Sequence, residues 1–359
     1  MSDTTPSPNQ PETVVQRIYT NPLHPGYLAD PFAWEYAGEY YAVGTGAVEA
    51  SGQEDDMGQA ASNFLTHLRL FPLLRSDDFV TWHEIGHALL PPDPSLGDTF
   101  WAPEVAYHEG TFYLYYSVGF EDKNHQLRVA TSTHPQGPYA DIGQTLWQPQ
   151  DLPFAIDPHP FQDEDGQWYL FYARDFLDTE GGARVGTALV VDRLLDMTTL
   201  AGEPQTVMRA HHDWQLFQKD REMYGRRWDW YTLEGPCVRK HEGRYYCFYS
   251  GGRWETEHYG VDYCVADNVL GPYEDTGNDA GPRVLGPVPD HVRGPGHISI
   301  LIGPDRQTPY LFYHAWDPGM TTRHMCMDKL IWTPEGPRCD GPTWTPQTIT
   351  AVLTQQDRL

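Results

Sequence analysis

The sequence predicts an all-β fold, and three features of the chain support that prediction. Aromatic residues make up 13% of the 359 residues, with 12 Trp and 22 Tyr, and aromatic side chains favour strands. Glycine and proline number 33 and 31, which is typical of a chain with many tight turns. Short segments in which aromatic and β-branched residues alternate recur along the chain, as expected for half-buried strands.

The recurring segments predict five similar sheets. In chain order they read AGEYYAVGTG at Gly38, EGTFYLYYSVG at Gly110, DGQWYLFYARD at Gly166, EGRYYCFYSGG at Gly243 and, as a looser copy, RQTPYLFYHAW at Gln307. Each copy reads as the turn and second strand of a β-hairpin. Five such units in one chain predict a single-domain, five-bladed β-propeller, because radial repetition protects the strand edges. An ordinary β-sandwich with aromatic-rich strands is the alternative.

The regions outside the repeats predict the domain limits. Residues 1–18 are expected to form a flexible N-terminal tail, residues 19–359 the propeller, and residues 51–61 a polar loop over one face. The five cysteines are odd in number and lack CxxC spacing, so we expect buried, unpaired thiols.

The charge balance limits the partners of the protein. Twenty-four basic and 50 acidic side chains give a net charge of −26, a field that repels phosphate backbones and anionic lipid headgroups. We therefore expect no nucleic-acid partner and no membrane partner. The segment MSDTTPSPNQPET has neither a basic start nor an apolar stretch, so a cytoplasmic protein is expected. The sequence carries no prediction of the oligomeric state.

The inner strand of each propeller blade lines the central channel, and the turns of the repeats locate it. Counting back eight or nine residues from the first four turns, and from Arg306 in the fifth copy, gives Asp30, Trp101, Asp157, Glu234 and His297. The acids lie in LADPF, AIDPHPF and TLEGP, each with a proline one or two residues further on, as expected at the start of a strand. We expect the three carboxylates to converge at the channel mouth. A turn-capping role for each Asp-Pro is the alternative.

Converging carboxylates are suited to acid–base chemistry. Mutual repulsion and partial burial raise the pKa of at least one of them, which leaves a protonated acid beside an ionised partner. Glycoside hydrolysis needs that combination, because one carboxylic acid protonates the leaving oxygen while a carboxylate activates water or attacks the sugar. The sequence therefore predicts a glycosidase with an oligosaccharide substrate. A non-catalytic carbohydrate-binding propeller is the alternative from another functional class.

Sugar-binding sites combine stacking rings with a few polar groups. The predicted substrate-binding residues are Phe32, Trp101, His159, Trp230, Trp254 and Arg293. Packing between blades is the alternative for each ring, and an exposed loop position is the alternative for the arginine.

Taken together, LADPF, FWAPEV, AIDPHPF, LEGP and GPGH resemble the motifs of the family 43 glycoside hydrolases, from about residue 19 to the end of the repeats. The resemblance implies a five-bladed propeller that cleaves with inversion of anomeric configuration. It implies Asp30 as general base, Asp157 as the residue that orients the acid and adjusts its pKa, and Glu234 as general acid. An inverting enzyme keeps its acid and base roughly 6.5–9.5 Å apart, with room for a water molecule.

The resemblance also implies a metal ion and a substrate class. A calcium ion is expected in the axial channel near His297, held largely through water; from the sequence alone, His297 reads as a hydrogen-bonded interior histidine. The substrate implied is a pentose-containing plant oligosaccharide, and the activity favoured is an exo-acting α-L-arabinofuranosidase. β-Xylosidase, endo-arabinanase and exo-galactanase activities are the alternatives.

Overall fold

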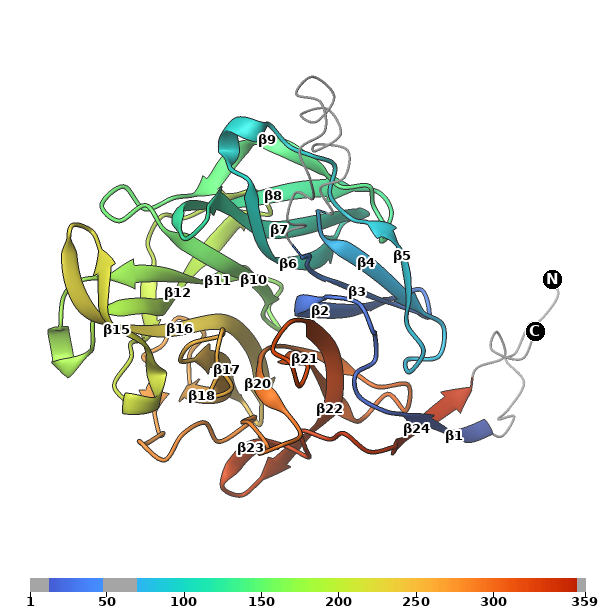
Figure 1. Ribbon diagram of the computed structural model, residues 1–359. Coiled ribbons are helices and arrows are strands. Elements are labelled where there is room, and N and C mark those ends of the chain that lie inside the picture. The colour runs from blue at the N-terminus through green and yellow to red at the C-terminus, as the bar shows by residue number, and fades with distance from the viewer. Residues whose placement is uncertain (1–12, 48–69, 354–359) are drawn as a thin grey trace, which may run out of the picture.

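The computed structural model describes residues 13–47 and 70–353, and this part of the chain is built almost wholly of strands. Figure 1 shows the sheets arranged in a ring around a common centre. Helical structure in the described residues is limited to three short 3-10 segments: η1 (Pro94–Leu96), η2 (Glu180–Gly182) and η3 (Asp213–Gln215). The all-β propeller predicted from the sequence is confirmed.

Five blades follow one another along the chain. Blade 1 contains β2 (Ala29–Tyr36), β3 (Glu39–Thr45), β4 (Pro72–Ser76) and β5 (His83–His87). Blade 2 contains β6 (Thr99–His108), β7 (Thr111–Phe120), β8 (Lys123–Ser132) and β9 (Ala140–Trp147). Blade 3 contains β10 (Ala155–Gln162), β11 (Trp168–Phe176), β12 (Gly186–Asp196), β13 (Thr199–Leu200) and β14 (Gln205–Met208).

The last two blades complete the ring. Blade 4 contains β16 (Arg226–His241), β17 (Arg244–Gly251), β18 (Gly260–Ala266) and β19 (Glu274–Asp275). Blade 5 contains β20 (Arg293–Ile302), β21 (Pro309–Trp316), β22 (Arg323–Thr333) and β23 (Gly336–Cys339). An added strand, β15 (Leu216–Met223), pairs with the first part of β16 and forms a hairpin outside the blade pattern.

The first strand of each blade lies at the centre of the ring. Strand β2 contacts β6 and β20, β10 contacts β6 and β16, and β16 contacts β20, so these five inner strands form a closed circuit. Neighbouring strands within a blade are antiparallel. A short parallel pairing of β12 with β16 joins blades 3 and 4 into one continuous sheet.

The predicted turns lie between the first and second strands of the blades. Gly38, Gly110, Gly166 and Gly243 have φ between 81° and 86°, a left-handed conformation that glycine adopts without steric cost. Tight hairpins need such residues, and this explains why the repeat shows a glycine there.

The hydrophobic core is divided among the five interfaces between blades. Each of the five large clusters of buried residues draws on two adjacent blades, including the interface between blades 5 and 1. Burial of these aromatic faces is favourable by about 25 cal/mol per Å² of apolar surface. The ring is therefore held together by packing between sheets, which is why the strands carry large residues on both faces.

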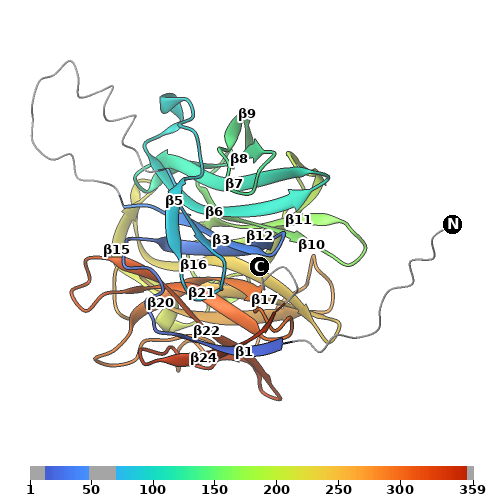
Figure 2. The ribbon, with the colours of Figure 1, turned by 90° about the vertical axis from the view of Figure 1, so that its right-hand side faces the viewer.

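A two-stranded ribbon ties the chain ends together. Strand β1 (Thr13–Tyr19) pairs antiparallel with β24 (Gln347–Leu353), and Figure 2 shows the two side by side on the outside of the ring. The prediction of a tail over residues 1–18 is therefore wrong for 13–18, because main-chain pairing with the C-terminal strand orders them. Residues 1–12 and the predicted loop at 51–61 lie outside the described residues.

Two smaller expectations concern thiols and membrane spans. All five cysteines are buried and unpaired, as predicted. Within residues 13–47 and 70–353, no helix has the length and apolar character needed to cross a bilayer.

Candidate active site

Every inner strand carries a β-bulge, and the bulged residue has a left-handed backbone. These residues are Asp30, Ala102, Asp157, Gly235 and His297, with φ of 51°, 46°, 58°, 56° and 52°. In the first four blades a proline follows immediately. A left-handed backbone costs roughly 1–2 kcal/mol for a residue other than glycine, and such strain is concentrated at functional sites.

The bulges show that two of the axial positions predicted from the sequence are wrong by one residue. The predicted axial positions included Trp101 and Glu234, but both precede the bulged residue, whereas Asp30 and Asp157 occupy it. A bulge places two residues opposite one, so side chains at and before it point differently. Trp101 therefore corresponds to Glu234 in position, and not to Asp30.

A repeated hydrogen bond fixes most of the bulges to the preceding blade. The acceptor position lies seven residues after the turn of that blade and is Thr45, Ser117, Ala173, Ser250 and His314 in chain order. Three of these side chains accept the bond, whereas Ser117 Oγ has no hydrogen-bond partner in the described part of the chain. Ala102 N–H donates to Thr45 Oγ1 at 2.9 Å, and His297 N–H donates to Ser250 Oγ at 2.7 Å. Asp30 N–H donates to His314 Nδ1 at 3.1 Å. We call this contact the amide latch.

The amide latch differs between blades 3 and 4. Blade 3 has Ala173 at the latch position, which has no side-chain acceptor. The amide of Gly235 instead donates to Asp157 Oδ2 at 2.8 Å. This bond fixes the Asp157 carboxylate against the peptide unit that follows Glu234, so the two predicted catalytic residues are joined through one backbone amide.

Asp30 lies at the centre of a polar cluster and is only 9% exposed. Its Oδ2 accepts a hydrogen bond from Thr45 Oγ1 at 2.7 Å. Its Oδ1 lies 3.3 Å from His297 Nδ1 and 3.3 Å from His314 Nδ1, and 3.5 Å from a guanidinium nitrogen of Arg323. The His297 Nδ1 atom is also 3.9 Å from Asp157 Oδ2, so the carboxylates of Asp30 and Asp157 face the same imidazole.

The surroundings keep Asp30 ionised. Burial alone would raise its pKa, but the facing His297 and the permanently charged Arg323 outweigh burial and hold the pKa of Asp30 below its ordinary value. At neutral pH this side chain is a carboxylate, the state that a general base requires.

The other two acids are shifted in the opposite direction. Burial, together with the charges of Glu234 and Asp30, raises the pKa of Asp157 well above its ordinary value. Burial and the charge of Asp30 raise the pKa of Glu234 to about 7, although a hydrogen bond from Tyr259 and the charge of Arg323 oppose that rise. The cluster therefore combines one ionised carboxylate with a neighbouring acid that holds its proton near neutral pH.

Arg323 is a residue of this site that sequence reasoning missed. It is 7% exposed and its guanidinium lies 4.3 Å from the centre of the Trp254 ring. It also donates to Tyr27 Oη at 2.8 Å. Trp254 is half-buried and stacks nearly parallel on Trp316. Arg323 thus contacts both Asp30 and the predicted Trp254. No repeat motif in the sequence marked this arginine.

Replacing Arg323 with glutamine is expected to move the pH profile of activity upward. Without this cation the pKa of Asp30 rises, so the base loses its charge at a higher pH and the acidic limb of kcat/KM shifts up. The pKa of Glu234 rises as well, so the alkaline limb shifts in the same direction. We expect a loss in kcat/KM of at least tenfold at the optimum, measured against Arg338→Gln at the exposed Arg338–Glu335 pair. Unshifted limbs would contradict this assignment.

Of the remaining aromatic predictions, two stay predictions and one is wrong. Trp101 is half-buried and stacks 3.9 Å from the His125 ring at 17°, and its equivalence to Glu234 keeps it a predicted sugar platform. Phe32 is half-buried and stacks on Trp34, and its contact with substrate stays a prediction. Trp230 is only 1% exposed and packs with Val185 and Met223. The prediction for Trp230 is wrong, because its ring is enclosed by side chains.

Of the two predicted polar ligands, one is wrong and one stays a prediction. His159 is 7% exposed, accepts from Val238 N–H at Nε2 (3.0 Å), and donates from Nδ1 to Glu104 at 2.7 Å. Both ring nitrogens are used in contacts between blades, so the prediction that His159 binds substrate is wrong. Arg293 is half-buried and makes no side-chain hydrogen bond or ion pair with another described residue. It therefore remains a predicted ligand for a sugar hydroxyl.

The predicted calcium ion is expected to be held largely through water, so the described side chains need not form a direct ligand set. Within the described ranges no group of three or more His, Cys, Asp or Glu side chains is arranged to hold a metal ion. Calcium takes six to eight oxygen ligands, whereas His297 offers an imidazole whose Nδ1 faces Asp30 and Asp157. Calcium near His297 stays a prediction that only a largely hydrated ion would satisfy, and no chemical step depends on it.

Chelation decides the calcium prediction. If calcium is bound near His297 as predicted, kcat/KM and Tm should fall after dialysis against excess EDTA, whereas unchanged values would leave His297 a structural residue. The matched control is the same protein dialysed and then supplied with millimolar CaCl2. A loss of activity that calcium alone restores would establish a water-held ion at the channel.

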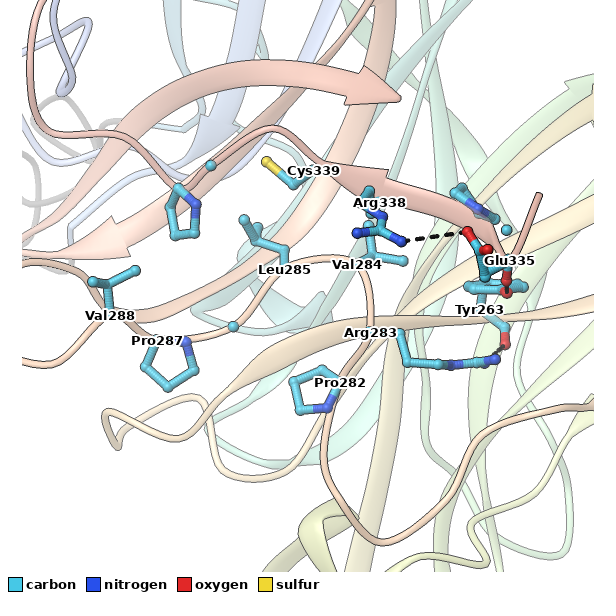
Figure 3. Close-up of a pocket in the computed structure, with 15 residues that line it drawn as sticks. Tyr263, Pro282, Arg283, Val284, Leu285, Pro287, Val288, Glu335, Arg338 and Cys339 are labelled. Carbon is cyan, nitrogen blue, oxygen red and sulfur yellow. Dashed lines mark hydrogen bonds and ion pairs between the residues drawn. The ribbon is translucent and has the colours of Figure 1, made fainter. Parts of the chain in front are cut away.

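A separate groove lies on the outer strands of blades 4 and 5. Figure 3 shows its lining, which includes Tyr263 of β18, Arg283 and Leu285 from the segment after β19, Glu335 just before β23, and Arg338 within β23. The groove has a volume of about 510 Å³. None of the three clustered acids lines it, so it is distinct from the candidate active site.

Comparison with known proteins places the chain among glycosidases. The sequence model described as "Glycosyl hydrolases family 43" matches residues 19–337. The β-D-galactofuranosidase xynD of Aspergillus niger is 28% identical over 331 residues, which cover 88% of this chain and 83% of that protein. Xylosidase/arabinosidase 43A of Humicola insolens is 26% identical over 332 residues, 85% of this chain and 94% of that protein. The crystal structure of a thermostable family-43 glycoside hydrolase superposes with a TM-score of 0.73 at 28% identity, covering 92% of this chain and 98% of that one.

Proposed function

Because this chain belongs to glycosyl hydrolases family 43, we propose that it is an inverting, exo-acting glycoside hydrolase that releases α-L-arabinofuranose from plant-derived oligosaccharides. The observation that carries the proposal is the pairing of an ionised Asp30 with a Glu234 whose pKa is raised to about 7. Opposite protonation states on two neighbouring carboxyl groups are what single-displacement glycoside hydrolysis requires.

The proposed reaction assigns one role to each acid. Asp30 accepts a proton from a water molecule as the water oxygen bonds to the anomeric carbon from one face. Glu234 gives its proton to the glycosidic oxygen as the bond from that oxygen to the anomeric carbon breaks, and the electron pair stays with the leaving group. Water thus supplies both the new hydroxyl and the proton that restores Glu234 through solvent. Asp157 accepts the amide hydrogen of Gly235 and so fixes the peptide unit that follows the acid.

The names of the relatives support a furanose or pentose substrate. The Humicola insolens protein is named a xylosidase/arabinosidase, and the Aspergillus niger protein a β-D-galactofuranosidase. Arabinofuranose shares its pentose skeleton with the first group and its five-membered ring with the second. A β-D-galactofuranoside is the second candidate substrate, because the relative at 28% identity carries that name, and a β-D-xyloside is the third.

Exo action is supported by the β15–β16 hairpin. Arg221 on β15 pairs with Asp122 in the β7–β8 turn at 2.7 Å, and Tyr224 at the hairpin tip donates to Asp175 on β11 at 2.8 Å. The charge of Arg221 acts on Glu234, so the hairpin lies beside the acid. We propose that a hairpin fixed to blades 2 and 3 at this point would block one end of the continuous passage that an endo-acting enzyme needs for a polymer.

A panel of aryl glycosides and oligosaccharides tests the proposal. We expect turnover of p-nitrophenyl α-L-arabinofuranoside above the β-D-galactofuranoside and β-D-xylopyranoside. From arabino-oligosaccharides we expect only arabinose as the first product, and proton NMR should show the inverted anomer first. A retained anomer would make Asp30 a nucleophile, and mixed oligosaccharide products would establish endo action. If wild-type protein binds oligosaccharides but turns over none, the protein is a carbohydrate-binding propeller.

A further inference from the structure

Tyr259 contacts the proposed general acid from outside the three-acid cluster. It precedes β18, is 1% exposed, and its hydroxyl donates to Glu234 Oε1 at 2.7 Å. Buried tyrosine hydroxyls require a hydrogen-bond partner. Here the partner is the side chain that must hold and release a proton.

The ring of Tyr259 is held in place by a glycine of the GPGH motif. A Cβ added to Gly296 would come within 2.2 Å and 2.4 Å of two Tyr259 ring carbons, so the ring lies directly against the β20 backbone and only glycine leaves room for it. The Tyr259 ring also stacks on His314, with centroids 5.8 Å apart and planes at 5°. The phenol is therefore positioned by two strands of blade 5 while its oxygen faces Glu234 of blade 4.

The same contacts connect the acid to the base. His314, on which Tyr259 stacks, accepts the amide of Asp30 in the amide latch. The hydroxyl of Ser250 lowers the pKa of Tyr259, against the rise that burial causes, and it accepts the amide of His297 at 2.7 Å. A shift of Tyr259 would therefore change its contact with Glu234. It would also change the surroundings of His314 and Ser250, which accept the amides of Asp30 and His297.

Donor and acceptor counting fixes which oxygen of Glu234 carries the proton. A phenol has one hydrogen to donate, and that hydrogen is directed at Oε1. The transferable proton of Glu234 is then carried on Oε2, because a proton on Oε1 would compete with the phenol for the same space. Once Oε2 has released the proton, the bond from Tyr259 becomes a bond to a full carboxylate, and such charge-assisted bonds are roughly twice as strong as neutral ones.

We propose that Tyr259, seated on Gly296, is a positioning residue that directs the Glu234 proton to Oε2 and stabilises the carboxylate left after the proton has moved to the glycosidic oxygen. The inference rests on the proposed function of Glu234. Because Tyr259 is 1% exposed and its hydroxyl donates to Glu234, it is assigned to act through the acid.

Other charged groups also face Glu234 and set the background for a test. They come from β2, β10, β22 and β15 and are Asp30, Asp157, Arg323 and Arg221. Substituting phenylalanine for Tyr259 leaves all four in place. Any change in the titration of Glu234 is then attributable to the missing hydroxyl.

The test is the pH profile of Tyr259→Phe on two leaving groups. Removing the donor raises the pKa of Glu234, so the alkaline limb of kcat/KM should move up by about one pH unit, while kcat/KM on an arabino-oligosaccharide falls about 10- to 100-fold. On 2,4-dinitrophenyl arabinofuranoside, whose leaving group needs little protonation, we expect a loss of less than threefold. Tyr263→Phe is the matched control, since its hydroxyl donates to the Glu335 carbonyl beside the outer groove.

A second variant keeps the test decisive if the phenylalanine variant melts early. 3-Fluorotyrosine at position 259 nearly preserves size and is a stronger donor, so it should move the alkaline limb to lower pH. An unmoved limb in both variants, with wild-type enzyme active, would overturn the role of Tyr259. Wild-type enzyme that hydrolyses none of the substrates would instead overturn the proposed function.

Discussion

Asp30→Asn is expected to lower kcat/KM by about 10²- to 10⁴-fold on every substrate that the wild-type enzyme hydrolyses. Asparagine has nearly the same shape but cannot take a proton from water. The loss should be as large for activated aryl glycosides as for oligosaccharides, because hydrolysis of every substrate needs the water molecule that Asp30 deprotonates. Asp192→Asn is the matched control: this aspartate is equally enclosed in blade 3 and accepts the Gly202 amide at 2.8 Å, away from the cluster.

A chemical rescue separates a lost base from a damaged fold. In Asp30→Gly the space of the carboxylate is free, and azide, which needs no deprotonation, can attack in place of water. We expect a glycosyl azide of inverted configuration, identified by NMR. An azide product of retained configuration would mean that another residue forms a covalent intermediate, and Asp30 would then not be the base of a single displacement.

Glu234→Gln is expected to show the opposite dependence on the leaving group. Oligosaccharide hydrolysis should fall by about 10²- to 10⁴-fold, because the glycosidic oxygen receives no proton. Hydrolysis of 2,4-dinitrophenyl glycosides should fall by less than tenfold, since that leaving group departs as an anion. Equal losses on both substrates would remove Glu234 from the acid role and leave it a structural residue.

The same variant should become more stable at alkaline pH. Burial raises the pKa of Glu234 from 4.5 to about 7 in the folded state, so the folded protein holds this proton more tightly than the unfolded chain. Stability linked to that proton is complete below pH 4.5 and is lost as the pH rises through 7. Glutamine does not titrate, so at pH 8 we expect a gain of about 1–3 kcal/mol in the free energy of unfolding, measured as Cm in urea. A lower Cm at pH 8 would contradict the burial argument.

The repeats predict the blades because each hairpin repeats its own local chemistry. A left-handed turn glycine and an alternating aromatic strand are short-range features, and Gly38, Gly110, Gly166 and Gly243 all appear where the pattern places them. Convergence of Asp30, Asp157 and Glu234 also follows from repetition, because equivalent strand positions meet at the axis. The bulges change the spacing between the turn and the axial residue. Glu234 lies one residue before the position in its strand that Asp30 occupies in blade 1, and nothing in the local composition marks this shift.

The rest of the site depends on contacts between blades, which a single repeat does not encode. Arg323, Tyr259 and Trp316 come from turns and outer strands whose register is set by neighbouring sheets. Trp230 was wrongly predicted because a tryptophan close to the acid in sequence packs beneath the hairpin instead. One signal was present: the residue seven positions after each turn is Thr45, Ser117, Ser250 or His314 in four blades, a recurring polar residue within an apolar strand.

The amide latch limits how such a ring can be rebuilt. Many repeat proteins grow or shrink by gaining or losing whole units, because each unit meets its neighbours in the same way. Here Ala173 in one blade is matched to an aspartate, and His314 in another to the main chain of Asp30. A copied or deleted blade would place the wrong side chain opposite the bulge of the next blade. Descendants of this chain are therefore free to vary their outer loops, but their number and order of modules are locked by the reaction centre itself.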